Sequence, residues 1–208
     1  IRHLHAHFGQ APATVAWFAA EMLNFRTSDR VRWSFTIHGF QDFVDEALAR
    51  LDLKARSAAF IACISDYTRS QLCRITPPHL WDRFHVIRCG IDLQSFPLRS
   101  AEPSNAHPSI ITVGRLSPEK GQLTLLLALA RLRDRGINAC VTYVGGGPLE
   151  PLLRSEIDRL QLHDRVRLAG ELLASDVQRH LVEADIFCLP SFSEGLPVSI
   201  MEAMASGV

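Results

Sequence analysis

Two cations stand at a strand-to-helix turn in the second half of the chain. The apolar run 109–113 ends at Gly114, and Arg115 and Lys120 follow before a helical pattern begins. Backbone N–H groups and the partial positive charge at a helix start favour a phosphate, and arginine adds a planar fork that lysine lacks. The chain has only two lysines, Lys54 and Lys120. The pattern favours a turn that binds a diphosphate; two surface cations in a turn are the alternative.

A glycine-rich turn follows the next strand of the same half. Gly145, Gly146 and Gly147 precede Pro148, and residues without a Cβ let a ligand or another backbone approach closely. The turn lacks the full GxGxxG pattern, and we expect no acidic residue at the end of the following strand to hold a ribose as in dinucleotide-binding domains. By itself this turn identifies no particular ligand.

Two glutamates flank the start of the last helical segment. Glu194 lies in the loop before Gly195, Leu196 and Pro197, and Glu202 lies about a turn and a half into the helix. Both carboxylates could accept hydrogen bonds from sugar or ribose hydroxyls, and the N–H groups of Gly195 and Leu196 are further donors. The alternative is a solvated loop residue and a charge that is favourable near a helix N-terminus.

Histidines mark two strands in the first half. His3, His5 and His7 alternate, so their imidazoles share one face of a strand. Same-face side chains stand roughly 7 Å apart, too far for an easy tridentate site, so a polar strand end facing a cleft is favoured over a metal site. His38 follows the apolar run 35–37 and could either contact a ligand or be a hydrogen-bonded structural residue.

Alternating strand and helix patterns must position these residues. In the second half we expect strands at 109–114, 139–144, 165–169 and 185–190, and helices over 123–130, 152–160, 175–183 with Ser175 as cap, and from Pro197 onward. In the first half we expect strands at 4–8, 34–38, 59–64 and 84–88, and helices over 12–23, 42–54 and from Asp66 onward. This alternation is typical of α/β folds with a parallel sheet covered on both faces, whose ligands bind beyond the carboxyl ends of the strands.

A polar segment divides the two halves. Residues 99–108 contain two prolines and little that could pack, which is typical of a linker. We therefore predict an incomplete N-terminal domain over 1–104 and a truncated C-terminal domain over 105–208. The chain starts at Ile1 without a methionine and its last helical segment runs into Gly207, so we expect an internal fragment.

Composition excludes several classes of protein. The 208 residues include 22 basic and 22 acidic side chains and are 47% hydrophobic, which excludes a disordered, collagen-like or coiled-coil chain. No apolar run approaches the ~20 residues of a membrane span, and the balanced charge argues against a nucleic-acid partner. Five cysteines lie in no CxxC pair and mostly in apolar runs, so we expect buried free thiols.

With these residues in place, the chain resembles the family-four retaining glycosyltransferases of the GT-B fold. The matching segments follow in order along nearly the whole chain: His5–Gly9, Thr36–Gly39, Ile64–Ser65, Val86–Asp92 with Phe96, Val113–Leu116 with Glu119–Gly121, Val144–Pro148, and Leu189–Pro197 with Glu202–Ala205. The opening segment and Cys89–Asp92 are most similar to bacterial exopolysaccharide enzymes of the colanic-acid and amylovoran type.

The resemblance implies two Rossmann-like domains with parallel sheets and a nucleotide-sugar site mostly in the C-terminal one. By motif match, Arg115 and Lys120 would bind the diphosphate, Glu202 the ribose and Glu194 the donor-sugar hydroxyls, and His38 would lie near the reacting sugar. The implied catalytic residues are His38, Arg115, Lys120 and Glu194. The implied donor-binding residues are Gly114, Arg115, Lys120, Gly146, Glu194, Gly195, Leu196 and Glu202.

The resemblance also implies an enzyme that transfers sugar with retention to a saccharide or lipid-linked acceptor in exopolysaccharide or cell-surface glycan synthesis. The chain has no Asp-x-Asp motif, and we expect neither a metal nor a cofactor, because the nucleotide sugar is a substrate. Front-face attack is favoured over a covalent intermediate, since no second carboxylate is evident. We expect a cytoplasmic location with peripheral contact at the inner face of the membrane. A hydrolase or epimerase of nucleotide sugars, or a non-catalytic nucleotide-sugar-binding protein, is the alternative.

Overall fold

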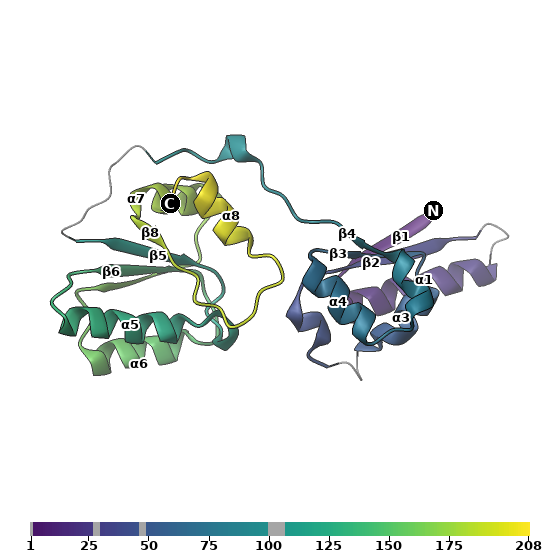
Figure 1. Ribbon diagram of the computed structural model, residues 1–208, viewed down its shortest axis with the longest axis horizontal. Coiled ribbons are helices and arrows are strands. Elements are labelled where there is room, and N and C mark those ends of the chain that lie inside the picture. Colours follow the sequence, from purple (N-terminus) through teal and green to yellow (C-terminus); the bar gives the residue numbers. More distant parts are fainter. Residues whose placement is uncertain (1, 27–29, 46–48, 100–106) are drawn as a thin grey trace. The chain divides into compact units, whose positions relative to one another are not determined.

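The computed structural model describes residues 2–26, 30–45, 49–99 and 107–208 (Figure 1). The chain forms two compact units, one reaching to Cys89 and including Glu194–Leu196, the other made of Gly90–Ser193 and Pro197–Val208. Residues 100–106 of the expected linker lie outside the described residues, so the predicted boundary between 104 and 105 stays a prediction.

The first unit contains a parallel sheet of four strands in the order β1-β2-β3-β4. Its strands are β1 (His3–His7), β2 (Arg32–Ile37), β3 (Phe60–Cys63) and β4 (Phe84–Val86). Its α-helices are α1 (Ala11–Arg26), α3 (Leu51–Ser57) and α4 (Asp66–Arg74), and 3-10 turns lie at Phe40–Phe43 and Pro78–Arg83. All four strands expected from the sequence are confirmed.

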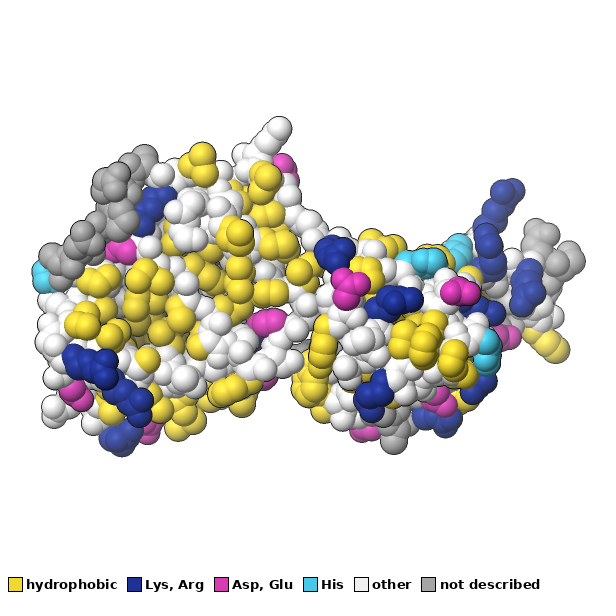
Figure 2. Space-filling view, in the orientation of Figure 1, with side chains coloured by type: hydrophobic (Ala, Val, Ile, Leu, Met, Phe, Trp, Pro, Cys, Tyr) yellow, Lys and Arg dark blue, Asp and Glu magenta, His cyan; other side chains and the backbone are white. Residues whose placement is uncertain are grey.

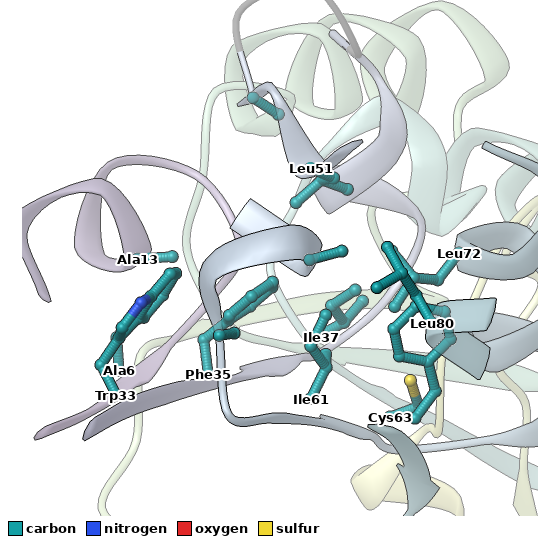
Figure 3. Close-up of a cluster of buried hydrophobic side chains, with 14 of the residues drawn as sticks. Ala6, Ala13, Trp33, Phe35, Ile37, Leu51, Ile61, Cys63, Leu72 and Leu80 are labelled. Carbon is teal, nitrogen blue, oxygen red and sulfur yellow. The ribbon is translucent and has the colours of Figure 1, made fainter. Parts of the chain in front are cut away.

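The core of this unit lies on strand β2. Trp33, Phe35 and Ile37 alternate along β2, so they share one face of the sheet and are buried there (Figure 3). Ala13 of α1 and Leu51 of α3 belong to the same buried cluster. Ser34 and Thr36 alternate with these residues on the other face of the strand, where they are buried and hydrogen-bonded to His3 and His5.

One helix of the first unit differs from expectation. The single continuous helix predicted over 42–54 is wrong: a 3-10 turn covers Phe40–Phe43, and Arg50, with φ 45°, breaks the helical path just before α3 begins at Leu51. Residues 46–48 of the predicted range lie outside the described residues. Asp42 is buried and bonded to backbone N–H groups at strand ends, which holds this stretch in a turn. The helix expected from Asp66 is confirmed. A capping box between Ser65 and Thr68 caps its N-terminus.

The second unit contains a parallel sheet in the order β7-β6-β5-β8. Its strands are β5 (Ser109–Val113), β6 (Cys140–Val144), β7 (Val166–Gly170) and β8 (Ile186–Phe187). Its α-helices are α5 (Gln122–Asp134), α6 (Glu150–Leu160), α7 (Ala174–Glu183) and α8 (Val198–Ala205), and 3-10 turns lie at Leu93–Ser95 and Pro118–Lys120. Helices α5 and α6 cover one face of the sheet, and α7 and α8 cover the other (Figure 1). The expected α/β fold with parallel sheets is confirmed, and in this unit helices cover both faces of the sheet.

Two local expectations for the second unit are wrong. The strand expected over 185–190 is only Ile186–Phe187, since the chain leaves the sheet toward Pro190, which has no N–H to pair. Ser175 does not cap α7, because the helix already begins at Ala174 after Leu173 and has no side-chain cap.

The cysteines are free thiols, as expected, but their burial differs from expectation. Cys63 alone is buried among them, Cys140 is exposed, and Cys73, Cys89 and Cys188 are intermediate. Burial raises the pKa of the Cys63 thiol to about 12, so this group is an inert part of the core.

The surface carries charge of both signs. Basic and acidic side chains are interspersed on the visible face of each unit (Figure 2). Among the described residues, no helix is both long and apolar enough to cross a membrane.

Candidate functional site

The carboxyl ends of β5, β6 and β7 open onto one cleft in the second unit. The cleft has a volume of about 620 Å³. Its lining consists of Val113, Gly114, Arg115, Val144, Gly145, Gly146, Gly147, Glu171, Leu172 and Val177. Parallel strands end at a common edge, so turns that are far apart in the sequence meet there. The structure therefore brings together the cationic turn at Arg115 and the glycine-rich turn.

Backbone hydrogen bonds join the turns beneath this cleft. The N–H of Gly114 donates to the oxygen of Val144 over 2.9 Å, and the N–H of Gly145 donates to that of Gly170 over 2.8 Å. Gly145 has φ 131°, and a Cβ there would overlap the carbonyl oxygen of Gly114. A Cβ at Gly147, with φ 154°, would overlap the carbonyl oxygen of Leu116. The glycines therefore let neighbouring backbones pack closely and give the cleft a fixed floor.

Arg115 combines a fixed backbone with an exposed side chain. Its carbonyl oxygen accepts a hydrogen bond of 2.7 Å from Nε2 of Gln122, which is 1% exposed. The Tyr143 hydroxyl in turn donates to the carbonyl oxygen of Gln122 over 3.2 Å. The guanidinium remains exposed at the cleft. Gln122 was not singled out in the sequence, because nothing local marks it as buried.

Lys120 lies on the 3-10 turn that follows, which also carries a carboxylate. The Ser117 hydroxyl donates to Oε1 of Glu119 over 2.6 Å. This bond is the main cause that lowers the pKa of Glu119, and the charges of Lys120 and Arg115 act in the same direction. The turn is thus a cluster of two cations around one ionised carboxylate. Of its charged side chains, Arg115 lines the described cleft and Lys120 does not.

Glu202 lies on α8, over the same face of the sheet as the apolar wall of the cleft. Its neighbour Ala203 packs in one buried cluster with Val144, and the cleft residues Leu172 and Val177 pack against that cluster. Glu202 is half-buried, and burial raises the pKa of its carboxyl. The loop residues Glu194, Gly195 and Leu196 cluster with the first unit, so their expected role beside Glu202 stays a prediction.

In the first unit, a buried aspartate joins the ends of β1 and β2. Asp42 is 2% exposed, and its two carboxylate oxygens accept hydrogen bonds from the N–H of Gly9 at 2.8 Å and of His38 at 2.9 Å. Nε2 of His38 lies 2.8 Å from Nδ1 of His7. Burial lowers the pKa of His38, His7 lowers it further, and Asp42 acts in the opposite direction. His38 is thus hydrogen-bonded at a strand end, and its expected place near the reacting sugar stays a prediction.

Lys54 completes this corner. It is 2% exposed, and Nζ donates to the carbonyl oxygens of Gly9 at 2.7 Å and Gln10 at 2.9 Å. Burial lowers the pKa of Lys54, with Asp42 opposing. Phe8 precedes this turn with φ 72°, a left-handed conformation rare for a bulky residue. Asp42 and Lys54 were not identified as site residues from the sequence, because Lys54 lies among other charged residues of α3, Asp52 and Arg56.

The histidines of β1 pair with hydroxyls of β2. The Ser34 hydroxyl oxygen lies 2.7 Å from Nε2 of His3 and 2.6 Å from Nδ1 of His5, and Thr36 Oγ1 lies 2.9 Å from Nε2 of His5. Across the part of the chain that the structure describes, no three His, Cys, Asp or Glu side chains are arranged to hold a metal ion. His3 and His5 are thus engaged by hydrogen bonds to β2.

Comparisons with known proteins identify the second half. The profile of the family described as glycosyl transferases group 1 matches residues 107–208. Residues 107–208 are a glycosyl transferases group 1 domain. The resemblance drawn from the motifs is confirmed at this level.

Relatives of the group 1 domain extend the similarity into the first unit. The colanic acid biosynthesis protein WcaL of Escherichia coli K12 is 34% identical over 151 residues, which cover 70% of this chain and 37% of that protein. The amylovoran biosynthesis glycosyltransferase AmsK of Erwinia amylovora is 35% identical over 133 residues, which cover 61% of this chain and 33% of that protein. The chain thus spans between 33% and 37% of the length of these relatives.

The whole chain is similar in fold to a solved structure. The crystal structure of Anabaena HepE in complex with UDP and glucose has a TM-score of 0.78 at 20% identity and covers 99% of this chain and 57% of that one. At this identity the likeness concerns the fold alone, which is the GT-B fold.

One expectation about the group 1 domain is corrected. An acidic residue does follow the strand after the glycine-rich turn: β7 ends at Gly170, and Glu171 comes next and lines the cleft. The sequence placed the strand end at 169 and passed over this glutamate. Glu171 thereby joins Gln122, Asp42 and Lys54 among the residues that only the structure brought out.

Proposed function

We propose that the full-length protein is a glycosyltransferase that moves a sugar from a nucleotide-diphosphate sugar to a saccharide or lipid-linked acceptor in cell-surface glycan synthesis. The observation that carries the proposal is the cleft itself. An exposed arginine, a glycine-packed backbone floor and an apolar wall meet at the carboxyl ends of three parallel strands. The names of the relatives, which concern colanic acid and amylovoran synthesis, support this class of product.

The donor diphosphate pairs with the cations of the second unit. Arg115 offers a planar guanidinium at the cleft while its own carbonyl is held by Gln122. Lys120 adds a second positive charge on the following turn. The Glu202 carboxylate, on the face that carries the apolar wall, accepts hydrogen bonds from the ribose hydroxyls.

Departure of the nucleotide is the step these cations accelerate. The bond between the anomeric carbon and the β-phosphate oxygen breaks, and the oxygen keeps the electron pair. Fixed cations aimed at that oxygen stabilise the transition state more than the ground state, because the charge grows as the bond lengthens. This supports transfer without a metal ion, which we include in the proposal.

We further propose that transfer retains the anomeric configuration by front-face attack. The acceptor hydroxyl oxygen bonds to the anomeric carbon on the side that the diphosphate leaves, and its proton passes to the departing phosphate. The resemblance assigns donor-sugar contacts to Glu194, Gly195 and Leu196 and a place near the reacting sugar to His38; these assignments stay predictions. We expect the protein in the cytoplasm, in contact with the membrane where it meets a lipid-linked acceptor.

An acceptor-dependent assay in EDTA tests the proposal. Labelled nucleotide sugars are incubated with the full-length protein, with and without a lipid-linked saccharide fraction, and the product is examined by NMR for its anomeric configuration. Transfer that needs the acceptor, proceeds in EDTA and retains configuration is the expected result. Release of free sugar without acceptor would favour a hydrolase, and nucleotide binding without turnover would favour a binding protein. A trapped glycosyl-enzyme adduct would exclude front-face attack.

A further inference from the structure

The Glu171 carboxylate stands at one end of the cleft. Glu171 directly follows β7, lines the cleft and is exposed. Its carboxylate lies against Gly146, where a Cβ would come within 2.9 Å of Oε1. No hydrogen bond or ion pair engages this carboxylate among the described residues. A hydrogen-bond acceptor therefore faces the space above the glycine-rich turn.

The two ends of the cleft carry opposite charge. The sheet order β7-β6-β5 puts Glu171 beyond one strand and Arg115 beyond the strand two places away, with Gly146 between them. Two inter-strand spacings are roughly 10 Å, which is comparable with the length of a nucleoside. A ligand that extends along this edge meets a cation at its anionic end and a carboxylate at the other.

The wall between these ends is apolar. Val113 and Val144 come from the strand ends, and Leu172 and Val177 come from the segment that enters α7 and from α7 itself. Aliphatic side chains of this kind cover the flat face of an aromatic base and leave its polar edge to a polar partner. If the diphosphate lies at Arg115, the base lies against this wall with its edge toward Glu171.

A carboxylate selects among the bases because it accepts hydrogen bonds and donates none when ionised. Guanine presents two adjacent donors, N1–H and the 2-amino group, which match the two carboxylate oxygens. Uracil presents one N–H between two carbonyl oxygens, which a carboxylate repels. Adenine presents an amino group next to an acceptor nitrogen. Guanine alone among these offers a bidentate pair.

We infer that Glu171 determines the base of the donor and that the donor is a guanosine diphosphate sugar. The inference rests on the proposed function, since it names the nucleotide of the same cleft. Glu171 would act in recognition of the donor and take no part in bond breaking.

A double-mutant cycle measures this recognition directly. Binding of GDP, IDP, UDP and ADP to the full-length protein is measured by calorimetry in EDTA, for the wild type, Glu171→Gln and the control Glu183→Gln. IDP is GDP without the 2-amino group, so the ratio of the GDP and IDP affinities isolates that one contact. Glu183 is an exposed glutamate at the opposite end of α7.

We expect wild-type protein to bind GDP about 10-fold or more tighter than IDP, the scale of one hydrogen bond to a charged group. In Glu171→Gln this ratio should fall, because the amide keeps one neutral acceptor in place of two charged ones, while Glu183→Gln should keep the wild-type ratio. Glu171 is exposed and unpaired, so a circular-dichroism spectrum and melting temperature like those of the wild type are expected for its variant.

The outcomes separate the two proposals. Tighter binding of UDP or ADP than of GDP, or a GDP to IDP ratio that survives Glu171→Gln, would overturn the inference and leave the proposed function standing. Absence of binding by all four nucleotides would overturn the proposed function and the inference with it.

Discussion

Arg99 and Asp185 form an ion pair that is almost wholly buried. Nη2 of Arg99 lies 2.5 Å from Oδ1 of Asp185, and the side chains are 8% and 7% exposed. The second oxygen of Asp185 accepts hydrogen bonds from the N–H of Ser109 at 2.8 Å and from its hydroxyl at 3.0 Å. The N–H of Arg99 donates to the carbonyl oxygen of Ser206 over 2.8 Å. The pair thus joins the segment before β5, the start of β8 and the end of α8.

Removing one member of this pair should be strongly destabilising. Asp185→Ala removes the carboxylate that pairs with Arg99 and accepts hydrogen bonds from Ser109, and loss of one member of a buried pair costs about 3–5 kcal/mol in the free energy of unfolding. Arg179→Ala is the control, because it removes an exposed pair with Asp176, and such pairs contribute little. Urea unfolding followed by circular dichroism measures both. Equal losses in the two variants would contradict a structural role for the buried pair.

Glycine at 145 should be needed for its backbone contact as well as for its dihedral angle. Gly145→Ala places a Cβ into the carbonyl oxygen of Gly114 at φ 131°, so the cost should exceed the roughly 1–3 kcal/mol of backbone strain alone. Gly136→Ala is the matched control: its φ is 77° and no heavy atom lies within 4 Å of the added Cβ. It should lose only about 1–2 kcal/mol. Thermal unfolding compares them, and a control as unstable as Gly145→Ala would refute the packing argument.

Most of the fold could be predicted from the sequence, because strands and helices follow from local patterns of apolar residues. Apolar runs, or in β1 an alternation of apolar residues with histidines, predicted the strands near their observed positions, and their alternation with helices predicted parallel sheets. The rule that ligands bind beyond the carboxyl ends of strands singled out the turns at Arg115 and Gly146, and both line one cleft. These inferences need only the period of the apolar residues and the order of the elements.

What the sequence did not reveal depends on contacts between distant residues. Asp42 looked like part of a helix, but its partners are N–H groups at Gly9 and His38. Lys54 is buried because two carbonyl oxygens near the end of β1 accept its hydrogen bonds. The Glu171 carboxylate lies against Gly146, although helix α6 separates the two residues in the sequence. A local sequence pattern does not predict such contacts between distant residues.

Arg115 should contribute to the transfer rate more than to donor affinity. Arg115→Ala removes a cation that stabilises the departing phosphate, and loss of one such group costs about 100-fold or more in kcat. Arg131→Ala, at an exposed position of α5, is the control and should keep the wild-type rate. Steady-state kinetics with the natural donor decide the matter. A variant that raises KM while keeping kcat would show that Arg115 only binds the donor.

The ionised Glu202 carboxylate should lower the free energy of unfolding at neutral pH. Burial raises the pKa of its carboxyl in the folded state. Below the unfolded value near 4.5 both states are protonated and no penalty exists, and the penalty is complete once the pH exceeds the folded value. Glu202→Gln should therefore be more stable than the wild type at pH 7, equally stable below pH 4.5, and weaker in nucleotide binding. Melting temperatures across this pH range test it.

Glu119 should change stability with pH in the opposite direction to Glu202. The Ser117 hydroxyl, together with the nearby cations, lowers the pKa of Glu119 in the folded state. Its ionised form therefore stabilises the fold above pH 4.5, and this contribution is lost as the pH falls through the folded value. Glu119→Gln should be less stable than the wild type at pH 7 and similar to it at low pH. If both glutamine variants move the same way at pH 7, the assigned environments are wrong.

The pKa of His38 should respond in opposite directions to its two charged neighbours. Burial and His7 hold this pKa below 6.5, and Asp42 acts to raise it. His7→Phe removes the repulsion and should bring the pKa closer to 6.5, whereas Asp42→Asn removes the attraction and should lower it further. His163→Phe, an exposed histidine of the second unit, is the control and should leave it unchanged. NMR titration of the imidazole carbon-bound protons, with the signal assigned through His38→Gln, measures each value.

Because the unfolded chain binds the proton first, the wild-type protein should also lose stability as the pH falls below 6.5. Shifts of the same sign in the two neighbouring variants would contradict the arrangement of this corner, and the His7 variant keeps the test readable should Asp42→Asn unfold.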